Sequence, residues 1–268
     1  MLTKVAHLPR RSVRYLEAGA GQPVVFLHAF PLSADQWLPQ LLRVPPGCRY
    51  IAPDLRGFRG AAGPVFDEAV LEGLSLDDYA ADVLELMAHL EIASAAVVGL
   101  SMGGYVAFAM LRRAPGRVSR LVLANTRASA DTDEGRAGRD RMVELVRRNG
   151  PIGLGLEMTP KLLGETTRQT QPDLADAVRR LVEANTPAAI VAALLAMKGR
   201  PDSTDLLPDI SCPVTIIAGE EDAVVPVDAS RAMQAAIPGA RLVVVPRAGH
   251  LSNLESPVAF TVAIESPG

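Results

Sequence analysis

Short apolar runs alternate with segments of helical period along the first half of the chain, and the two patterns together predict βαβ units. Four runs of three or four residues are short enough for buried strands: Val24–Leu27, Tyr50–Ala52, Ala95–Val98 and Leu121–Ala124. Ser12–Ala18 instead alternates polar and apolar residues, as a half-exposed antiparallel strand does. Helices are expected between the runs, over Ser33–Leu42, Ser75–Leu90 and Gly104–Arg113.

Two of these helices carry a local start signal. Ser33 with Gln36, and Ser75 with Asp78, have the spacing of a capping box. The Gly-, Ala- and Pro-rich segment 57–73 is expected to be a loop.

The strand–helix alternation breaks after residue 126. Only helical segments separated by Pro and Gly follow: Glu134–Asn149, Ile152–Leu163, Pro172–Ala184 and Pro187–Lys198. Strand-type runs resume at Val214–Ile217 and Leu242–Val245. We therefore expect a mostly parallel α/β sheet built from residues 1–126 and 208–268. A helical cap, residues 127–207, is inserted between two strands and lies over their carboxyl ends, where open α/β sheets bind ligands.

Composition narrows the possible classes. The chain has 268 residues, 49% of them hydrophobic, and a net charge of −3 with interleaved charges, which argues against a nucleic-acid or membrane partner. No signal-peptide core and no long apolar span is visible, and only two cysteines occur, Cys48 and Cys212. These features predict a cytoplasmic protein with no metal or cofactor. The sequence does not decide whether Cys48 and Cys212 form a disulfide.

The segment Gly99-Leu100-Ser101-Met102-Gly103 joins a predicted strand to a predicted helix. A serine in such a G-x-S-x-G turn is held out at the top of the sheet, as a nucleophile elbow holds it. The glycines permit a turn in which side chains would collide. Ser101 is therefore the candidate nucleophile.

A serine hydroxyl needs a base, and the base needs an acid. His250 follows the Leu242–Val245 strand and so lies at the same sheet edge as Ser101; His28 is the second candidate, although bracing its own loop is its favoured role. Asp222 follows the Val214–Ile217 strand, with the alternatives Glu220 and Glu221 adjacent to it. The order Ser, Asp, His matches this type of fold.

Two backbone N–H groups are expected to stabilise the oxyanion. They belong to Met102, directly after the serine, and to Phe30, in the loop after the Val24–Leu27 strand.

Six segments carry a resemblance to a known family: LHAFP, PDLRGF, VVGLSMGG, RLVLANT, CPVTIIAGEEDAVVP and AGHLSNLESP. Over nearly its whole length the chain resembles the α/β-hydrolase superfamily. HAFPLSADQW, GLSMGG and LVLANTRA resemble small bacterial carboxylesterases and 3-oxoadipate enol-lactonase-like hydrolases. The family commonly has glycine where this chain has Ala29 and Arg59, and its dehalogenases have an aspartate nucleophile, which Ser101 argues against. Asn125 stands where some relatives carry the triad acid, which favours Asp222.

The function expected from these residues is hydrolysis of carboxylic esters or lactones through an acyl-enzyme on Ser101. Enol-lactonase or perhydrolase (haloperoxidase-type) activity on the same triad is the alternative, and a hydrolase-fold receptor with little turnover is the alternative of another class. Arg127 and Leu251 are candidate substrate-binding residues. Arg127 could bind a substrate carboxylate, although a surface ion pair with Asp131 or Asp133 is the favoured interpretation. The expected partner is a small molecule, and the oligomeric state stays open.

Overall fold

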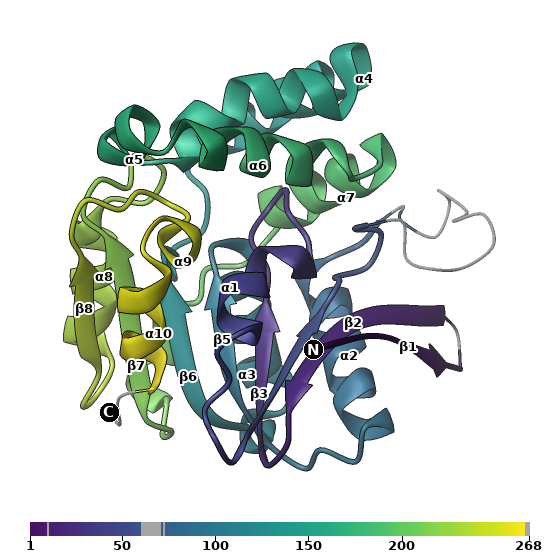
Figure 1. Cartoon of the computed structure of the whole chain (residues 1–268), viewed down its shortest axis with the longest axis vertical. Helices are drawn as coiled ribbons and strands as arrows, with labels where there is room; N and C mark the ends of the chain where they lie inside the picture. The colour runs from purple at the N-terminus through teal and green to yellow at the C-terminus, as the bar shows by residue number, and fades with distance from the viewer. Residues whose placement is uncertain (10, 60–70, 72, 266–268) are drawn as a thin grey trace.

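The computed structural model describes residues 1–9, 11–59, 71 and 73–265. It contains one eight-stranded sheet with the order β1-β2-β4-β3-β5-β6-β7-β8 (Figure 1). The strands are β1 (Leu2–Leu8), β2 (Arg11–Gly19), β3 (Gln22–Leu27), β4 (Cys48–Pro53), β5 (Ala95–Leu100), β6 (Val118–Ala124), β7 (Val214–Gly219) and β8 (Arg241–Val245). Strands β3 to β8 run parallel to one another, whereas β2 is antiparallel to both β1 and β4. The expected mostly parallel α/β sheet is thus confirmed.

The register of the central strands brings their carboxyl ends to one edge. Gly99 pairs with Leu27, Leu100 with Ala124, and Gly219 with Val245. The loops that follow β3, β5, β6, β7 and β8 therefore leave the sheet at the same edge, because parallel strands end in register there. The side chains of β5 and β7 are almost all buried, as expected for strands covered on both faces.

Helices cover both faces of the sheet. In Figure 1 the helices α1 (Leu38–Leu41) and α10 (Pro257–Glu265) lie in front of the sheet, and α2 (Leu76–His89) and α3 (Met102–Arg113) lie behind it. Helix α8 (Val227–Ala236) connects β7 to β8, and α9 (Ser252–Glu255) follows β8. Among the described residues, three short 3₁₀ segments accompany these helices: η1 (Ala34–Trp37), η3 (Pro115–Arg117) and η4 (Thr204–Asp209).

The two capping boxes have different outcomes. At the start of α2, the Ser75 hydroxyl accepts from the Asp78 N–H and the Asp78 carboxylate accepts from the Ser75 N–H, which confirms the box. The box at Ser33 is wrong, because the Ser33 side chain makes no cap hydrogen bond. The Gln36 amide oxygen accepts instead from the Ala29 N–H at 2.9 Å, and the segment begins as a 3₁₀ turn rather than one helix.

Between β6 and β7 the chain forms four helices, α4 (Asp133–Leu162), α5 (Glu165–Thr170), α6 (Pro172–Glu183) and α7 (Pro187–Lys198). They lie across the carboxyl edge of the sheet, at the top of Figure 1. Helix α4 is broken at Gly150, whose φ of 65° and ψ of −168° are not helical, so the two helices expected on either side are continuous except at this residue.

Some elements were not anticipated. Neither strand β1 nor helix α5 was expected, because the apolar residues of β1 do not alternate regularly and α5 contains none. The expected loop 57–73 falls mostly outside the described residues. Cys48 and Cys212 are both free thiols.

Within the described chain, no single helix is long and apolar enough to cross a bilayer. Helices α6 and α7 meet that criterion only as a pair, and they are bent by 93° at the break between them.

Candidate active site

Ser101 stands in a sharp turn between β5 and α3. Its φ of 54° and ψ of −114° are unfavourable for a residue with a side chain, and such strain is found where a side chain must be presented in one direction. The flanking glycines make the turn possible. A Cβ on Gly99 would lie 2.4 Å from the Gly103 carbonyl oxygen, and a Cβ on Gly103 would lie 2.1 Å from the Leu27 carbonyl oxygen. Glycine is therefore required at both positions by close backbone packing.

Two hydrogen bonds from the neighbouring strand hold the turn. The Ser101 N–H donates to the Ala124 carbonyl at 2.9 Å, and the Thr126 hydroxyl donates to the Ser101 carbonyl, also at 2.9 Å. The backbone of Ser101 is thus fixed from the end of β6, while its side chain faces a cavity.

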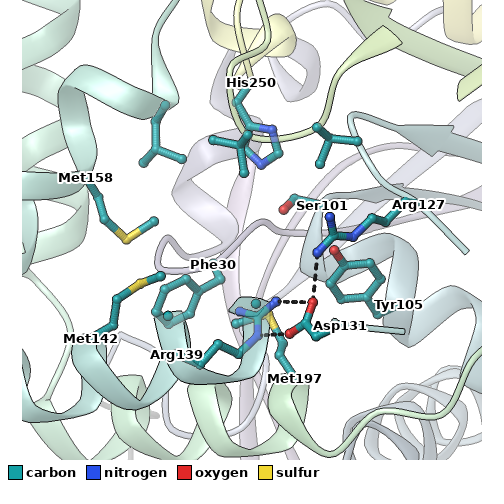
Figure 2. Close-up of a pocket in the computed structure, with 15 residues that line it drawn as sticks. Phe30, Ser101, Tyr105, Arg127, Asp131, Arg139, Met142, Met158, Met197 and His250 are labelled. Carbon is teal, nitrogen blue, oxygen red and sulfur yellow. Dashed lines mark hydrogen bonds and ion pairs between the residues drawn. The ribbon is translucent and has the colours of Figure 1, made fainter. Parts of the chain in front are cut away.

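His250 and Asp222 form a buried pair beside that cavity. Nδ1 of His250 lies 2.8 Å from Oδ2 of Asp222, and the two side chains are 1% and 0% exposed. A carboxylate can only accept, so Nδ1 carries the proton and Nε2 is left with a free lone pair. Figure 2 shows the His250 ring and the Ser101 hydroxyl facing the same cavity.

Every lone-pair direction of Asp222 is occupied. Oδ1 accepts from the backbone N–H groups of Val224 and Val225 at 2.8 and 2.9 Å, and Oδ2 accepts from the Asn125 amide at 2.9 Å as well as from His250. Burial alone would raise the pKa of Asp222, but the electrostatic interaction with His250 and these hydrogen bonds together lower it below its usual value. Asp222 is therefore ionised at neutral pH.

The alternative acids and base have other partners. Glu221 accepts from the N–H and hydroxyl of Thr166, and the exposed Glu220 accepts from the Arg247 N–H. Both nitrogens of His28 are engaged, Nδ1 with the Ala29 carbonyl at 3.0 Å and Nε2 with the Leu55 N–H at 3.0 Å. His28 is fully buried, and its hydrogen bonds confirm that it braces the loop after β3.

The cavity has a volume of about 240 Å³ and is lined by residues from loops at the carboxyl edge of the sheet and from helices α3, α4 and α7. Phe30 lines it, and Met102 is the first residue of α3, where a backbone N–H has no partner within the helix. Most of the remaining wall is apolar: Met142, Met158, Leu162, Met197, Val224 and Val225. The cavity is small compared with most ligand pockets, so it suits a small acyl or alcohol group.

The two candidate substrate-binding residues occupy different places. Arg127 lines the cavity and pairs with Asp131 at 2.8 Å. The pair is not the exposed one expected, because the Asp131 side chain is only 1% exposed; Asp133 pairs with Arg136 instead. Leu251 is fully buried at the start of α9 and is not among the described residues that line the cavity.

Two further residues support the His250 loop, and neither was expected to do so from the sequence. Asn125 donates to Asp222 and to the Gly249 carbonyl and accepts from the Ser252 hydroxyl at 2.6 Å. Glu255 accepts from the backbone N–H groups of Gly249 and Leu251. The only sequence signal was position, since Asn125 directly follows a strand and Glu255 lies close to His250.

In the part of the chain that the structure describes, no three His, Cys, Asp or Glu side chains are grouped so that they could hold an ion.

Comparison with known proteins shows the family to which this fold belongs. A family model described as the alpha/beta hydrolase fold matches residues 22–257, and the chain belongs to that family. Its structure is similar to that of a thermophilic esterase from Thermogutta terrifontis, solved with malate bound, at 36% identity and a TM-score of 0.90, covering 98% of this chain and 97% of that one. It is also similar to the enol-lactonase from Burkholderia xenovorans LB400, at 25% identity and a TM-score of 0.86 over 97% and 98% of the two chains. The non-heme chloroperoxidase CPO-A1 of Kitasatospora aureofaciens is 30% identical over 259 residues, 88% of this chain and 87% of that protein.

Proposed function

We propose that this protein is a serine hydrolase that cleaves small carboxylic esters or lactones. The observation that carries the proposal is the buried Asp222–His250 hydrogen bond at the wall of the cavity that Ser101 also lines. The esterase and enol-lactonase relatives support the same reaction class.

In the first half-reaction, Oγ of Ser101 attacks the ester carbonyl carbon while Nε2 of His250 takes the hydroxyl proton. The negative charge on the carbonyl oxygen is stabilised by the N–H groups of Phe30 and Met102. As the intermediate collapses, the carbon–oxygen bond to the alcohol breaks. His250 gives its proton to the leaving oxygen, and an acyl group remains on Ser101.

In the second half-reaction, water attacks the acyl carbon and gives a proton to Nε2 of His250. The proton then passes to Oγ of Ser101 as the carboxylic acid leaves. Asp222 stays ionised throughout. Its carboxylate holds the imidazole of His250 in the required tautomer and stabilises the protonated form of the ring.

The test is a series of 4-nitrophenyl esters from acetate to decanoate, with the Ser101→Ala protein as blank. We expect wild-type turnover to favour the short acyl groups, because the cavity is small. A fluorophosphonate probe should phosphonylate Ser101 with loss of fluoride, so that the peptide containing Ser101 gains the mass of the phosphonyl group and turnover is abolished. A folded wild-type protein that neither turns over any ester nor reacts with the probe would instead be a hydrolase-fold receptor.

The chloroperoxidase relative favours perhydrolysis as a second candidate. In that reaction hydrogen peroxide replaces water as the attacking group on the acyl-enzyme, so a peracid is released. The ratio of peracid to acid, measured from one ester at increasing peroxide concentration, distinguishes the two. An enzyme adapted to perhydrolysis should form peracid well above the ratio set by the concentrations of peroxide and water.

A further inference from the structure

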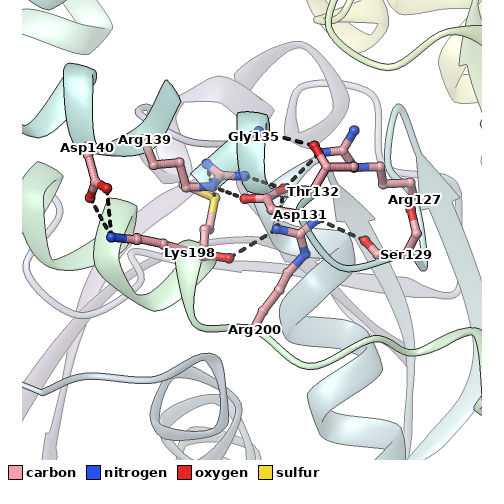
Figure 3. Close-up of polar contacts among 10 residues, drawn as sticks. Arg127, Ser129, Asp131, Thr132, Gly135, Arg139, Asp140, Lys198 and Arg200 are labelled. Carbon is pink, nitrogen blue, oxygen red and sulfur yellow. Dashed lines mark hydrogen bonds and ion pairs between the residues drawn. The ribbon is translucent and has the colours of Figure 1, made fainter. Parts of the chain in front are cut away.

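Asp131 is the centre of an unusual group of charges in the wall of the cavity. Its carboxylate pairs with three guanidinium groups: Arg127 Nη2 and Arg200 Nη1 at 2.8 Å each, and Nε of Arg139 (Figure 3). Three positive charges against one negative charge leave a formal excess of two. Asp131 itself is nearly inaccessible, with 1% of its side chain exposed. Burial would raise the pKa of Asp131, but the arginines lower it to about 2, so the carboxylate stays ionised.

Nearby acids offset this excess only in part. Asp140 pairs with Lys198 at 2.6 Å, and Asp133 pairs with Arg136 at 3.2 Å with its own side chain fully exposed. Asp202 accepts from the Ala130 and Thr204 N–H groups, and its charge also interacts with that of Arg200. The excess positive charge that remains therefore lies on Arg127 and Arg139.

One of the three arginines is structural. Arg200 is 3% exposed, donates to the Met197 and Ser129 carbonyls at 3.0 and 2.9 Å, and stacks on the Tyr105 ring at 4.1 Å from the ring centre. It fastens the end of α7 to the chain that follows β6. Arg200 is not one of the described residues that line the cavity.

The other two arginines face the cavity. Arg127 and Arg139 line it together with Ser101, and Figure 2 shows Arg127 and Tyr105 on the side opposite Met142. A guanidinium has five N–H donors, and Asp131 uses only some of them. Arg139 donates to Asp131 from Nε and Nη2, whereas Arg127 donates to it only from Nη2. Nε of Arg127 has no hydrogen-bond partner in the described chain, and Nη1 of Arg139 meets only the Met197 thioether, a weak acceptor, at 3.5 Å.

We propose that Arg127 and Arg139 form an anion subsite that binds a carboxylate on the substrate. The proposal rests on the proposed hydrolase function and specifies its substrate class: an ester or lactone that carries a carboxylate away from the scissile carbonyl. A carboxylate entering a small, mostly apolar cavity loses its hydration, and two partly unpaired guanidinium forks replace that hydration with charge-assisted hydrogen bonds. Asp131 holds the forks in place and reduces the repulsion between them.

The test compares two 4-nitrophenyl esters whose acyl groups have the same number of carbons: the neutral pentanoate and the hemiglutarate, which ends in a carboxylate. Wild type should prefer the hemiglutarate in kcat/KM. Arg127→Gln and Arg139→Gln should each reduce that preference by about tenfold or more and change pentanoate turnover much less. Arg147→Gln is the matched control, because Arg147 is an exposed arginine on the same helix as Arg139. A third ester, 4-acetoxybenzoate, carries its carboxylate on the alcohol side, so it reports which half of the substrate uses the subsite.

Two measurements keep the proposal testable if an arginine variant is unstable. The wild-type preference should fall as ionic strength rises, while pentanoate turnover stays constant. Glutarate should bind the Ser101→Ala protein in a calorimeter, and should bind the same protein carrying Arg139→Gln much more weakly.

The outcomes separate the two proposals. Turnover of pentanoate without a hemiglutarate preference, or an equal loss for both esters in the arginine variants, overturns the subsite and leaves the hydrolase. Glutarate binding that depends on Arg139, with no turnover of any ester, supports the subsite and overturns the hydrolase function. Glutarate that fails to bind the folded Ser101→Ala protein overturns the subsite directly.

Discussion

The carboxylate of Glu255 accepts a hydrogen bond from the backbone N–H of Gly164 at 2.8 Å, and this contact joins the helical layer to the loop that carries His250. The same carboxylate accepts from Gly249 at 3.0 Å and Leu251 at 3.1 Å, the residues on either side of His250. The N–H groups of His250 and Leu251 in turn donate to the Leu162 carbonyl. The position of His250 thus depends on where the end of α4 lies.

Glu255→Gln should therefore lower both stability and kcat. An amide retains one acceptor oxygen and turns an N–H₂ group toward backbone donors, so at least one of the three hydrogen bonds is lost. We expect a loss of about 2 kcal/mol in the free energy of unfolding, measured by urea denaturation. KM should change less than kcat, because the cavity wall is intact while the base is displaced.

Glu157→Gln is the control, since Glu157 is a half-exposed residue of α4 that pairs only at the surface with Lys161. Its stability and kcat should match those of wild type. If Glu255→Gln matched them too, the contact with Gly164 would have no role in placing His250.

Asp222→Asn should reduce kcat by about 10³- to 10⁴-fold and leave the fold intact. The amide oxygen can still accept from the Val224 and Val225 N–H groups, so the loop is retained. The amide nitrogen then faces His250 and no longer holds the proton on Nδ1. Steady-state ester hydrolysis measures the rate, and circular dichroism measures the fold.

Glu220→Gln and Glu221→Gln are the matched controls for loss of a carboxylate in the same loop. Both should retain most of the activity, because Glu220 bonds to Arg247 and Glu221 to Thr166. If a glutamate variant were inactive while the Asp222→Asn protein stayed active, the assignment of Asp222 as the acid would be wrong.

Gly103→Ala should disrupt the turn that presents Ser101. The new Cβ would lie 2.1 Å from the Leu27 carbonyl oxygen, which is backbone and cannot rotate away. We expect a loss of at least about 2 kcal/mol in stability, together with a lower kcat as α3 moves away from β3. A variant with wild-type melting temperature and kcat would contradict this packing.

Gly116→Ala is the control for that experiment. Gly116 lies in the turn before β6, and a Cβ there would meet no atom within 4 Å. Its melting temperature should stay close to that of wild type.

The sequence predicted those parts of the molecule that follow from local pattern. Buried strands are short apolar runs, so β3 to β8 were located within a few residues, and the turn at Ser101 was found because its glycines are required by packing. The positions of Asp222 and His250 followed because parallel strands end at one edge. These inferences needed no long-range contact.

The rest depends on contacts between residues far apart in the chain. The capping-box pattern assigned Gln36 incorrectly, because the Gln36 side chain accepts a hydrogen bond from the Ala29 N–H and donates one to Asn253. Asp131 has the same character. The residues around Asp131 in the sequence suggest a surface ion pair with Arg127. In the fold, Asp131 is buried and also pairs with Arg200, which follows the end of α7.

His28 should make stability depend on pH between about 4 and 6.5. Burial lowers the pKa of His28 from 6.5 to about 4, against the smaller opposing effect of its hydrogen bond to Ala29. In that interval the unfolded chain binds a proton that the folded protein does not, so the free energy of unfolding falls as the pH falls. The full loss, reached below pH 4, is about 3.5 kcal/mol, because each pKa unit corresponds to about 1.4 kcal/mol.

The measurement is the difference between wild type and His28→Gln in urea unfolding at a series of pH values. Carboxylates such as Asp54 and Asp82, whose pKa values are raised by burial, titrate in both proteins and cancel in the difference. His28→Gln should be less stable than wild type at neutral pH, because two hydrogen bonds are disturbed, and the gap should narrow as the pH falls toward 4. His89→Gln, at an exposed position on α2, controls for the loss of an imidazole. A gap of constant size across this interval would mean that His28 accepts a proton in the folded protein as readily as in the unfolded chain.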